Sequence, residues 1–463
     1  MSKTYIKDFT QGSVAKHLLV FAAPLFLSNL LQVVYNLVDM IIVGHVAGET
    51  GLSAVAIGGD VTNFLTFLSM GFSSAGQVLI SQQIGAGHRK RIGRFICTMV
   101  SFLLTLSLCV STVCLLLREP ILRLMHTPAE SFTQTMEYAT VCMFGLVFIY
   151  GYNITGAVLR GMGDSKHPFL FISLAALLNV LLDILFVMVL DFGAKGAALA
   201  TVISQAVSFL SCSIFLAKNR RKFELTLNYS DFIHWDSAML RALIRLGVPM
   251  AIKSASIQFS RLFVSSWINS YGVTVSAVAG IASKFSSICK LVSEALNTAG
   301  SSMVGQNIGA EKYHRVPRIM MTAFALMLMI STIIAGLLAA FPAEVFGIFT
   351  DKKEVLQVCM EYLPIAVVFF YASAFRTPMN ALINGSGNYR INFVTAILDG
   401  MILRIGLSLL FGLVLGMDYV GFWLGDALAG FTPFFIGLVY YISGKWKKQI
   451  TPDGHRCGAP PAR

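Results

Sequence analysis

Twelve apolar stretches dominate this chain of 463 residues, and each is long enough to cross a lipid bilayer. A membrane-spanning helix needs about 20 mostly apolar residues. The connections are short, and the longest one inside the chain, residues 218–240, leaves six stretches on either side. The sequence therefore predicts an all-α polytopic membrane protein with twelve transmembrane helices. With soft ends, the stretches are residues 17–43, 53–81, 93–117, 132–159, 168–190, 196–217, 241–269, 276–305, 316–341, 356–383, 391–415 and 419–443.

The composition excludes the other broad classes of protein. Apolar residues make up 56% of the chain and charged residues only 13%, about half the charged share of a typical soluble protein. A soluble enzyme, a disordered chain and a disulfide scaffold are therefore excluded. The eight cysteines show no spacing typical of metal ligands, so neither a structural metal nor another cofactor is expected.

An internal repeat relates the two halves of the chain. Gln-Gln-Ile-Gly-Ala at residues 82–86 recurs as Gln-Asn-Ile-Gly-Ala at residues 306–310, an offset of 224. Arg-Gly-Met-Gly-Asp at residues 160–164 recurs at the same offset as Asn-Gly-Ser-Gly-Asn at residues 384–388. Because each half has an even number of spans, the halves insert in the same orientation, as parallel repeats. That arrangement places a substrate site between two lobes near the middle of the membrane.

The repeat also predicts the domain boundaries. Residues 1–217 form an N-lobe with spans 1–6, and residues 241–445 form a C-lobe with spans 7–12. A cytoplasmic interlobe loop, residues 218–240, joins them, and residues 446–463 form a cytoplasmic polar tail. The glycines of the cytoplasmic loop motifs are expected to supply turns with positive φ; they are Gly85, Gly87, Gly161, Gly163, Gly309, Gly385 and Gly387.

Lysine and arginine residues predict the orientation. With the N-terminus inside, the cytoplasmic segments hold 23 of the 35 basic residues and the outer segments hold 5. Cytoplasmic loops of membrane proteins carry an excess of lysine and arginine, so both termini are expected to face the cytoplasm. The same bias explains the net charge of +12 without nucleic acid as a partner. No cleavable signal pattern precedes the first stretch, which we interpret as a retained span.

Together these features resemble the multidrug and toxic compound extrusion (MATE) family. The resemblance rests on the twelve spans in two parallel halves and on the paired loop motifs, and it extends over about residues 12–445. The first span, with Pro24 and the Tyr-Asn-Leu-Val-Asp of residues 35–39, is similar to the prokaryotic DinF-like branch. The resemblance implies a monomeric transporter, not an enzyme, in the bacterial inner membrane. It also implies that the protein exports small amphiphilic drugs or toxic compounds by alternating access, coupled to H⁺ or Na⁺.

In the DinF-like branch, the residues that respond to the proton or to Na⁺ are a tyrosine and an aspartate in the first span and polar residues in the fourth to sixth spans. The resemblance therefore implies a cation-coupling site here, and Na⁺ at Asp39 and Asp183 is the only metal ion expected. The matching positions are Tyr35, Asp39, Asn153, Asn179, Asp183 and Thr201.

Carboxylates inside the spans of the first half support a cation site independently. An ionisable residue at the centre of a bilayer costs about 2.5–3.5 kcal/mol on insertion scales, so it marks a functional site by default. Asn179 and Asp183 are one helical turn apart and share a face. Brought near Asp39, they would accept a proton or hold Na⁺ through oxygen ligands. The alternative is that Asp39 lies in an interface loop and that Asn179 only bonds a neighbouring helix.

The second half has the opposite polarity. Leucine and valine stand at the positions equivalent to the N-lobe cluster, and all seven basic residues inside spans fall in this half: Arg245, Lys253, Arg261, Lys284, Lys290, Arg376 and Arg404. Lys290 and Glu294 are spaced to pair on one helix face, and Asp399 is expected to meet an arginine from a neighbouring span. For the unpaired basic residues, contact with helix carbonyls or lipid headgroups is the alternative to a cavity. The predicted substrate cavity takes its polar lining from Gln32, Asn36, Lys253, Arg261, Lys284 and Glu294.

Pro24 predicts a bend in the first span, because proline removes a backbone hydrogen bond and clashes with the preceding turn. We expect a hinge that moves the span when Asp39 changes protonation, and a static kink is the alternative. Two rival functions remain open. One is a lipid-linked oligosaccharide flippase of the same superfamily, and the other is a channel, although nothing resembles a selectivity filter.

Overall fold

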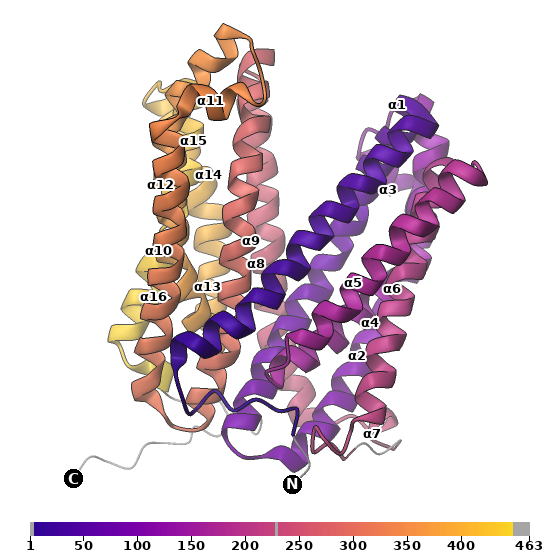
Figure 1. Cartoon of the computed structure of the whole chain (residues 1–463), viewed down its shortest axis with the longest axis vertical. Helices are drawn as coiled ribbons and strands as arrows, with labels where there is room; N and C mark the ends of the chain where they lie inside the picture. Colours follow the sequence, from indigo (N-terminus) through magenta and orange to yellow (C-terminus); the bar gives the residue numbers. More distant parts are fainter. Residues whose placement is uncertain (1–3, 227–229, 448–463) are drawn as a thin grey trace. The chain divides into compact units, whose positions relative to one another are not determined.

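The computed structural model describes residues 4–226 and 230–447, and these residues are helical nearly throughout, with no strand among them (Figure 1). Only helices and closed barrels satisfy every backbone polar group inside a bilayer, so the apolar stretches fold as helices. In the first half the elements are α1 (Val14–Gly85), α2 (Arg89–Leu116), α3 (Arg118–Leu124), α4 (Ala129–Gly161), α5 (Lys166–Asp183), the π-helix η1 (Ile184–Val189), α6 (Gly193–Lys218) and α7 (Ser230–Ile233).

The second half repeats this pattern with more interruptions. Its elements are α8 (Ser237–Asn269), α9 (Val273–Gly309), the 3₁₀-helix η2 (Tyr313–Arg315), α10 (Val316–Ala340), α11 (Pro342–Gly347), α12 (Lys353–Gly385), α13 (Tyr389–Ile397), the π-helix η3 (Leu398–Leu403), α14 (Arg404–Leu409), the π-helix η4 (Leu410–Val414), α15 (Asp418–Ala429), α16 (Thr432–Ile442) and the 3₁₀-helix η5 (Lys445–Lys447).

The predicted twelve spans can be counted on these elements. In the described chain, ten helices, taken with their direct continuations, are long and apolar enough to cross a membrane. One of them, α1, has 72 residues and changes direction at Gly48, where φ is 64° and ψ is −157°, so it holds two spans. The twelfth, α8, has 33 residues but also four basic side chains. The prediction of an all-α fold with twelve spans is confirmed.

The chain divides into two compact units, which we call the N-lobe unit and the C-lobe unit. The N-lobe unit contains Ala23–Val248 and the N-terminal residues up to Asp8, and the C-lobe unit contains Phe9–Ala22 and the chain from Pro249 onward. Residues of the predicted interlobe loop pack on the N-lobe unit, where Arg94 lies 3.7 Å from Asp236. Most of the predicted polar tail, residues 448–463 with Cys457, lies outside the described residues.

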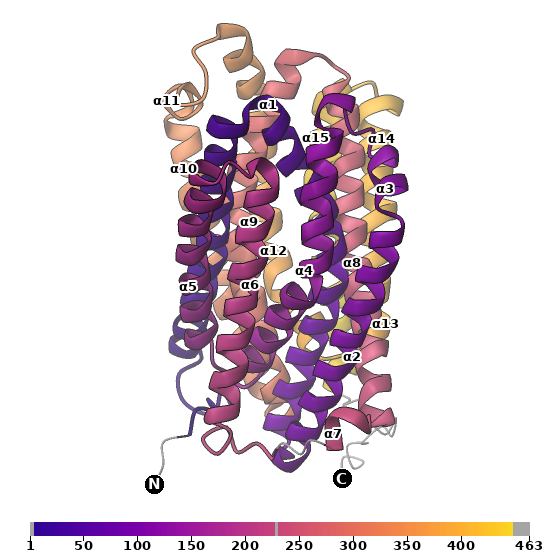
Figure 2. The same cartoon turned by 90° about the vertical axis from the view of Figure 1, so that its right-hand side faces the viewer.

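Each unit is built around one central helix. In the N-lobe unit, α4 packs against both α2 and α6 (Figure 2). In the C-lobe unit, α12 packs against α9, α10, α15 and α16. Helices α4 and α12 occupy equivalent positions of the repeat, so the two lobes share one packing plan.

The repeat is also visible in two close backbone approaches. A Cβ atom at Gly161 would lie 2.9 Å from the carbonyl oxygen of Gln77, and one at Gly385 would lie 2.7 Å from that of Ser301. Gly385 and Ser301 each lie 224 residues after their counterparts, Gly161 and Gln77. The expectation of positive φ is wrong for Gly161 and Gly385, because they end helices α4 and α12 and allow close packing instead. It is also wrong for Gly85 and Gly309, which end helices α1 and α9. It is confirmed for Gly87, Gly163 and Gly387, where φ is 75°, 84° and 68°.

Candidate functional site

A cavity of about 520 Å³ lies inside the N-lobe unit, among α1, α4 and α6, and we call it the N-lobe cavity. Its first wall is one face of α1, because residues three, four and seven positions apart share a face. Six residues predicted from the sequence line it: Gln32, Tyr35, Asn36, Asp39, Asn153 and Thr201. The tertiary structure therefore brings these residues of three helices to one space.

Asp39 lies within α1 and is only 6% exposed. The alternative that it lies in an interface loop is therefore wrong. Its Oδ1 atom is buried and has no hydrogen-bond partner among the described residues. Asp39 faces the N-lobe cavity.

Asp183 does not line this cavity but lies buried near it, at the end of α5. It is 0% exposed, and neither of its carboxylate oxygens has a hydrogen-bond partner within the described chain. The charges of Asp39 and Asp183 are close enough to interact. A π-helical segment, Ile184–Val189, begins directly after Asp183, and such segments are frequent at functional sites.

Asn179 lies in a second, narrow cavity, which it shares with Tyr35, Thr201 and Gln205. This space is about 10 Å³, roughly enough for one water molecule. The Nδ2 atom of Asn179 donates to Thr201 Oγ1 on α6 at 3.5 Å. Asn179 therefore does bond a neighbouring helix, as the alternative interpretation of this residue expects. Its Oδ1 atom, however, is buried and unpartnered among the described residues, so an oxygen ligand remains available.

Several polar residues of the N-lobe cavity were not predicted from the sequence, among them Asp60, Tyr138 and Gln205. Asp60 lies in the part of α1 that follows Gly48. The sequence could have indicated it, because it is a carboxylate inside an apolar stretch. Tyr138 and Gln205 carry no such signal, because tyrosine and glutamine occur on any helix face. Their role in the lining follows only from how α4 and α6 pack.

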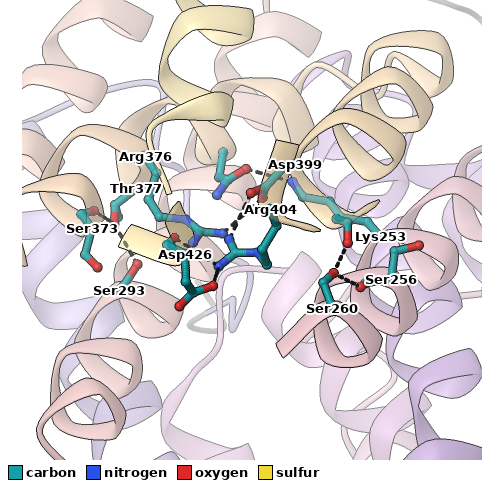
Figure 3. A network of polar contacts seen from close by, with 12 residues as sticks. Lys253, Ser256, Ser260, Ser293, Ser373, Arg376, Thr377, Asp399, Arg404 and Asp426 are labelled. Carbon is teal, nitrogen blue, oxygen red and sulfur yellow. Dashed lines mark hydrogen bonds and ion pairs between the residues drawn. The ribbon is translucent and has the colours of Figure 1, made fainter. Parts of the chain in front are cut away.

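The C-lobe unit contains a group of ion-paired side chains that we call the C-lobe charge network (Figure 3). Arg404 Nη2 donates to Asp399 Oδ1 at 3.0 Å, and Arg404 Nη1 pairs with Asp426. Arg376 of α12 lies 3.5 Å from Asp399 Oδ2. The prediction that Asp399 meets an arginine of a neighbouring span is confirmed. Asp426 was missed, although a carboxylate in an apolar stretch is again its signal.

Helix α8 lies directly against this network. The hydroxyl of Ser260 donates to the carbonyl oxygen of Gly400. A Cβ atom at Gly400 would lie 2.6 Å from Cβ of Ser256. Glycine at this position therefore allows α8 to approach the segment that carries Asp399.

The four C-lobe residues predicted to line the substrate cavity differ from one another in burial and in bonding partners. Lys253 is buried, and its Nζ atom donates to Asn380 Oδ1 of α12 at 2.7 Å. Arg261 forms no ion pair and no hydrogen bond within residues 4–226 and 230–447. Lys284 is exposed. Glu294 is half-exposed and lies 3.7 Å from Lys290, which confirms the predicted pairing.

Both halves of the chain match a known protein family. The family model MatE matches residues 24–185 and again residues 249–410, one match in each half of the repeat. The chain is 29% identical over 440 residues to the probable multidrug resistance protein YpnP of Bacillus subtilis, covering 95% of this chain and 97% of the relative. It is 23% identical over 456 residues to the probable multidrug resistance protein NorM of Thermotoga maritima, covering 96% of each.

Solved structures show the same fold. A structure described as MATE in the bent conformation superposes with a TM-score of 0.87 at 22% identity, covering 94% of this chain and 96% of the other. A MOP superfamily transporter from Pyrococcus furiosus gives a TM-score of 0.88 at 22% identity, covering 97% and 100%. At this identity the likeness concerns the fold, two lobes with twelve helices in all.

Proposed function

This chain belongs to the MatE family, whose members are membrane transporters and not enzymes, and we propose that it exports small amphiphilic compounds in exchange for H⁺ or Na⁺. The names of the two bacterial relatives, as probable multidrug resistance proteins, support export of varied compounds. The observation that carries the coupling is a buried Asp183, without a hydrogen-bond partner in the described part of the chain, near the cavity-lining Asp39.

The energetic argument starts from the two carboxylates. Transferring an isolated ionised carboxylate into a low-dielectric interior is very unfavourable. No hydrogen bond from a described residue offsets that cost for Asp183, and Asp39 adds a like charge close by. The pair is therefore most stable when one cation, a proton or Na⁺, neutralises part of its charge. Thr201 lines the N-lobe cavity together with Asp39 and the narrow cavity together with Asn179, so the side-chain oxygens of Asn179 and Thr201 are the candidates to complete a Na⁺ site.

The cation and the substrate would affect each other's binding, because Asp39 belongs to both sites. The N-lobe cavity, at about 520 Å³, is within the range of small-molecule pockets, about 300–1,000 Å³. Asp39 lines it and also interacts with Asp183, so a cation bound at the pair changes the charge that a substrate meets. Coupling requires such a differential affinity between the cation-bound and cation-free states. Cation entry from outside would thus favour substrate release.

We propose that the protein lies in the bacterial inner membrane as a monomer, with both termini in the cytoplasm. The basic loops support this orientation. In the C-lobe unit, Lys312 Nζ donates to the carbonyl oxygen of Thr10 at 3.1 Å, and Tyr313 packs on Trp446 at 6.0 Å between ring centroids. The N-terminal segment and the end of the last helix therefore lie at the same end of this lobe.

The proposal is tested with purified protein in proteoliposomes that enclose a fluorescent amphiphilic cation. We expect an imposed pH or Na⁺ gradient to drive the compound uphill, and only one of the two gradients to suffice. Flux that only runs downhill and ignores both gradients would indicate a channel. Movement of a lipid-linked oligosaccharide, with no movement of the amphiphile, would indicate a flippase.

A further inference from the structure

The charges inside the C-lobe unit do not cancel. In the C-lobe charge network, Arg376 and Arg404 are matched by Asp399 and Asp426. Lys253 and Arg261 add two positive charges from α8, and neither forms an ion pair in the described part of the chain. This cluster therefore has an excess of two positive charges. Charged side chains within transmembrane segments almost always pair with a partner.

Arg261 is the less satisfied of the two cations. Lys253 has at least a neutral acceptor, Asn380. The Nε atom of Arg261 is buried with no hydrogen-bond partner, and no described residue accepts from its guanidinium. The side chain still interacts electrostatically with all four members of the network. It is only partly buried, so a ligand can reach it.

The acceptor groups around Arg261 are bonded to other partners. Asp399 already faces two arginines, and Asp426 pairs with Arg404. The Ser260 hydroxyl, one residue before Arg261, is directed at the carbonyl oxygen of Gly400 (Figure 3). Residues 4–226 and 230–447 therefore leave the guanidinium of Arg261 without an acceptor.

We propose that Arg261 binds one anionic group of the carboxylate or phosphate class, with Lys253 adding a second positive charge from the same face of α8. Residues eight positions apart lie on one face and about 12 Å apart along the axis. Arg261 therefore makes the direct contact, and Lys253 acts over a longer distance. The planar guanidinium fork matches two oxygens of such a group. This site is separate from the N-lobe residues of the proposed cation coupling.

The anionic group has two possible sources with the same chemistry. It is either a free anion or the head of an amphiphile or lipid. We test both on the full-length protein, purified in an uncharged detergent, by isothermal titration calorimetry. The probes are inorganic phosphate and octylphosphonate, and octyltrimethylammonium is the probe of opposite charge.

We expect octylphosphonate to bind the native protein and Arg261→Gln to weaken that binding about 10-fold or more, since a hydrogen bond to a charged group contributes about 1.5–3 kcal/mol. Binding of inorganic phosphate as well would identify a free anion as a sufficient ligand, whereas binding of octylphosphonate alone would identify an amphiphile or lipid head. Absence of binding for both anions, or equal binding by the native protein and Arg261→Gln, overturns the proposal.

Lys290→Gln is the matched control, because it removes the same charge from the same lobe at a half-exposed position. It should bind octylphosphonate like the native protein, and an equal loss would mean a general effect of net charge and would overturn the site. If Arg261→Gln does not yield monodisperse protein, Arg261→Lys replaces it. That variant keeps the charge but loses the fork, so unchanged affinity contradicts the proposal. No gradient is used, so the result is independent of the export assay.

Discussion

Two aspartates with no exposed surface have opposite surroundings in this protein. Asp399 is held by Arg376 and Arg404, whereas both oxygens of Asp183 lack a hydrogen-bond partner among the described residues. Burial alone therefore does not identify a functional carboxylate. Removing one partner of a buried ion pair is strongly destabilising, whereas a buried carboxylate without a partner is the better candidate for a functional site.

Asp183→Asn should leave the protein folded and inserted but abolish gradient-driven export. The amide keeps the shape of the side chain and cannot exchange a proton, and it removes the charge that a Na⁺ ion would require. Export is measured in proteoliposomes at matched protein content. Export at the native rate would contradict the assignment of Asp183 to the coupling site.

Asp399→Asn is the counterpart and should instead destabilise the protein. It leaves two arginines facing a neutral amide, and removing one partner of a buried ion pair costs about 3–5 kcal/mol. We expect a clearly lower thermal midpoint in detergent, measured by intrinsic fluorescence. Asp183→Asn, studied in parallel, should show no such decrease, and equal midpoints for both variants would contradict the contrast.

At the scale of single helices, close packing depends on glycine at equivalent positions of the two lobes. Gly385 of α12 meets the carbonyl oxygen of Ser301, as Gly161 of α4 meets that of Gln77. Gly385→Ala should destabilise the protein by about 1–3 kcal/mol, because the added methyl group has no room and helices must separate. Thermal unfolding in detergent measures the change.

Gly336→Ala in α10 is the control, since no atom other than its chain neighbours and its own helix backbone lies within 4 Å of the added Cβ. It should be neutral or slightly stabilising, because alanine has the higher helix propensity. A similar loss of stability in both variants would mean that helix packing at Gly385 is not the cause.

The first helix is the element expected to move. Pro24 lies inside α1 just after Ala22, where the chain passes from the C-lobe unit to the N-lobe unit. If Pro24 is a hinge, Pro24→Ala should still bind substrate but fail to release it on acidification or Na⁺ addition. Substrate binding and release are measured separately by fluorescence anisotropy. Release that remains as in the native protein would leave only a static kink.

At the scale of the whole molecule, the orientation in the membrane can be tested at the C-terminus. Cys457 lies outside the described residues, and the basic loops predict that it faces the cytoplasm. A thiol reagent that does not cross membranes should label it only after spheroplasts are permeabilised. Cys457→Ser identifies labelling of other cysteines, and Cys457-dependent labelling of intact spheroplasts would invert the topology.

Hydropathy, loop charge and the repeat were sufficient to predict the twelve helices in two lobes from the sequence alone. These signals are local, because a span of about 20 apolar residues folds as a helix whatever its neighbours are. The same local rule marked Asp39 and Asp183 as costly groups inside spans. The same rule applies to Asp60 and Asp426, which were not predicted as members of either cluster.

Only the tertiary structure decided which side chains each of these groups contacts. Asp183 and Asp399 are both carboxylates in apolar stretches, and hydropathy alone does not distinguish them. One lies against apolar helices near Asp39, and the other lies between Arg376 and Arg404. The difference depends on contacts between helices that are far apart along the chain. Helix packing sets those contacts through side-chain shape and through close approaches such as that at Gly400, and neither has a periodic signal in the sequence.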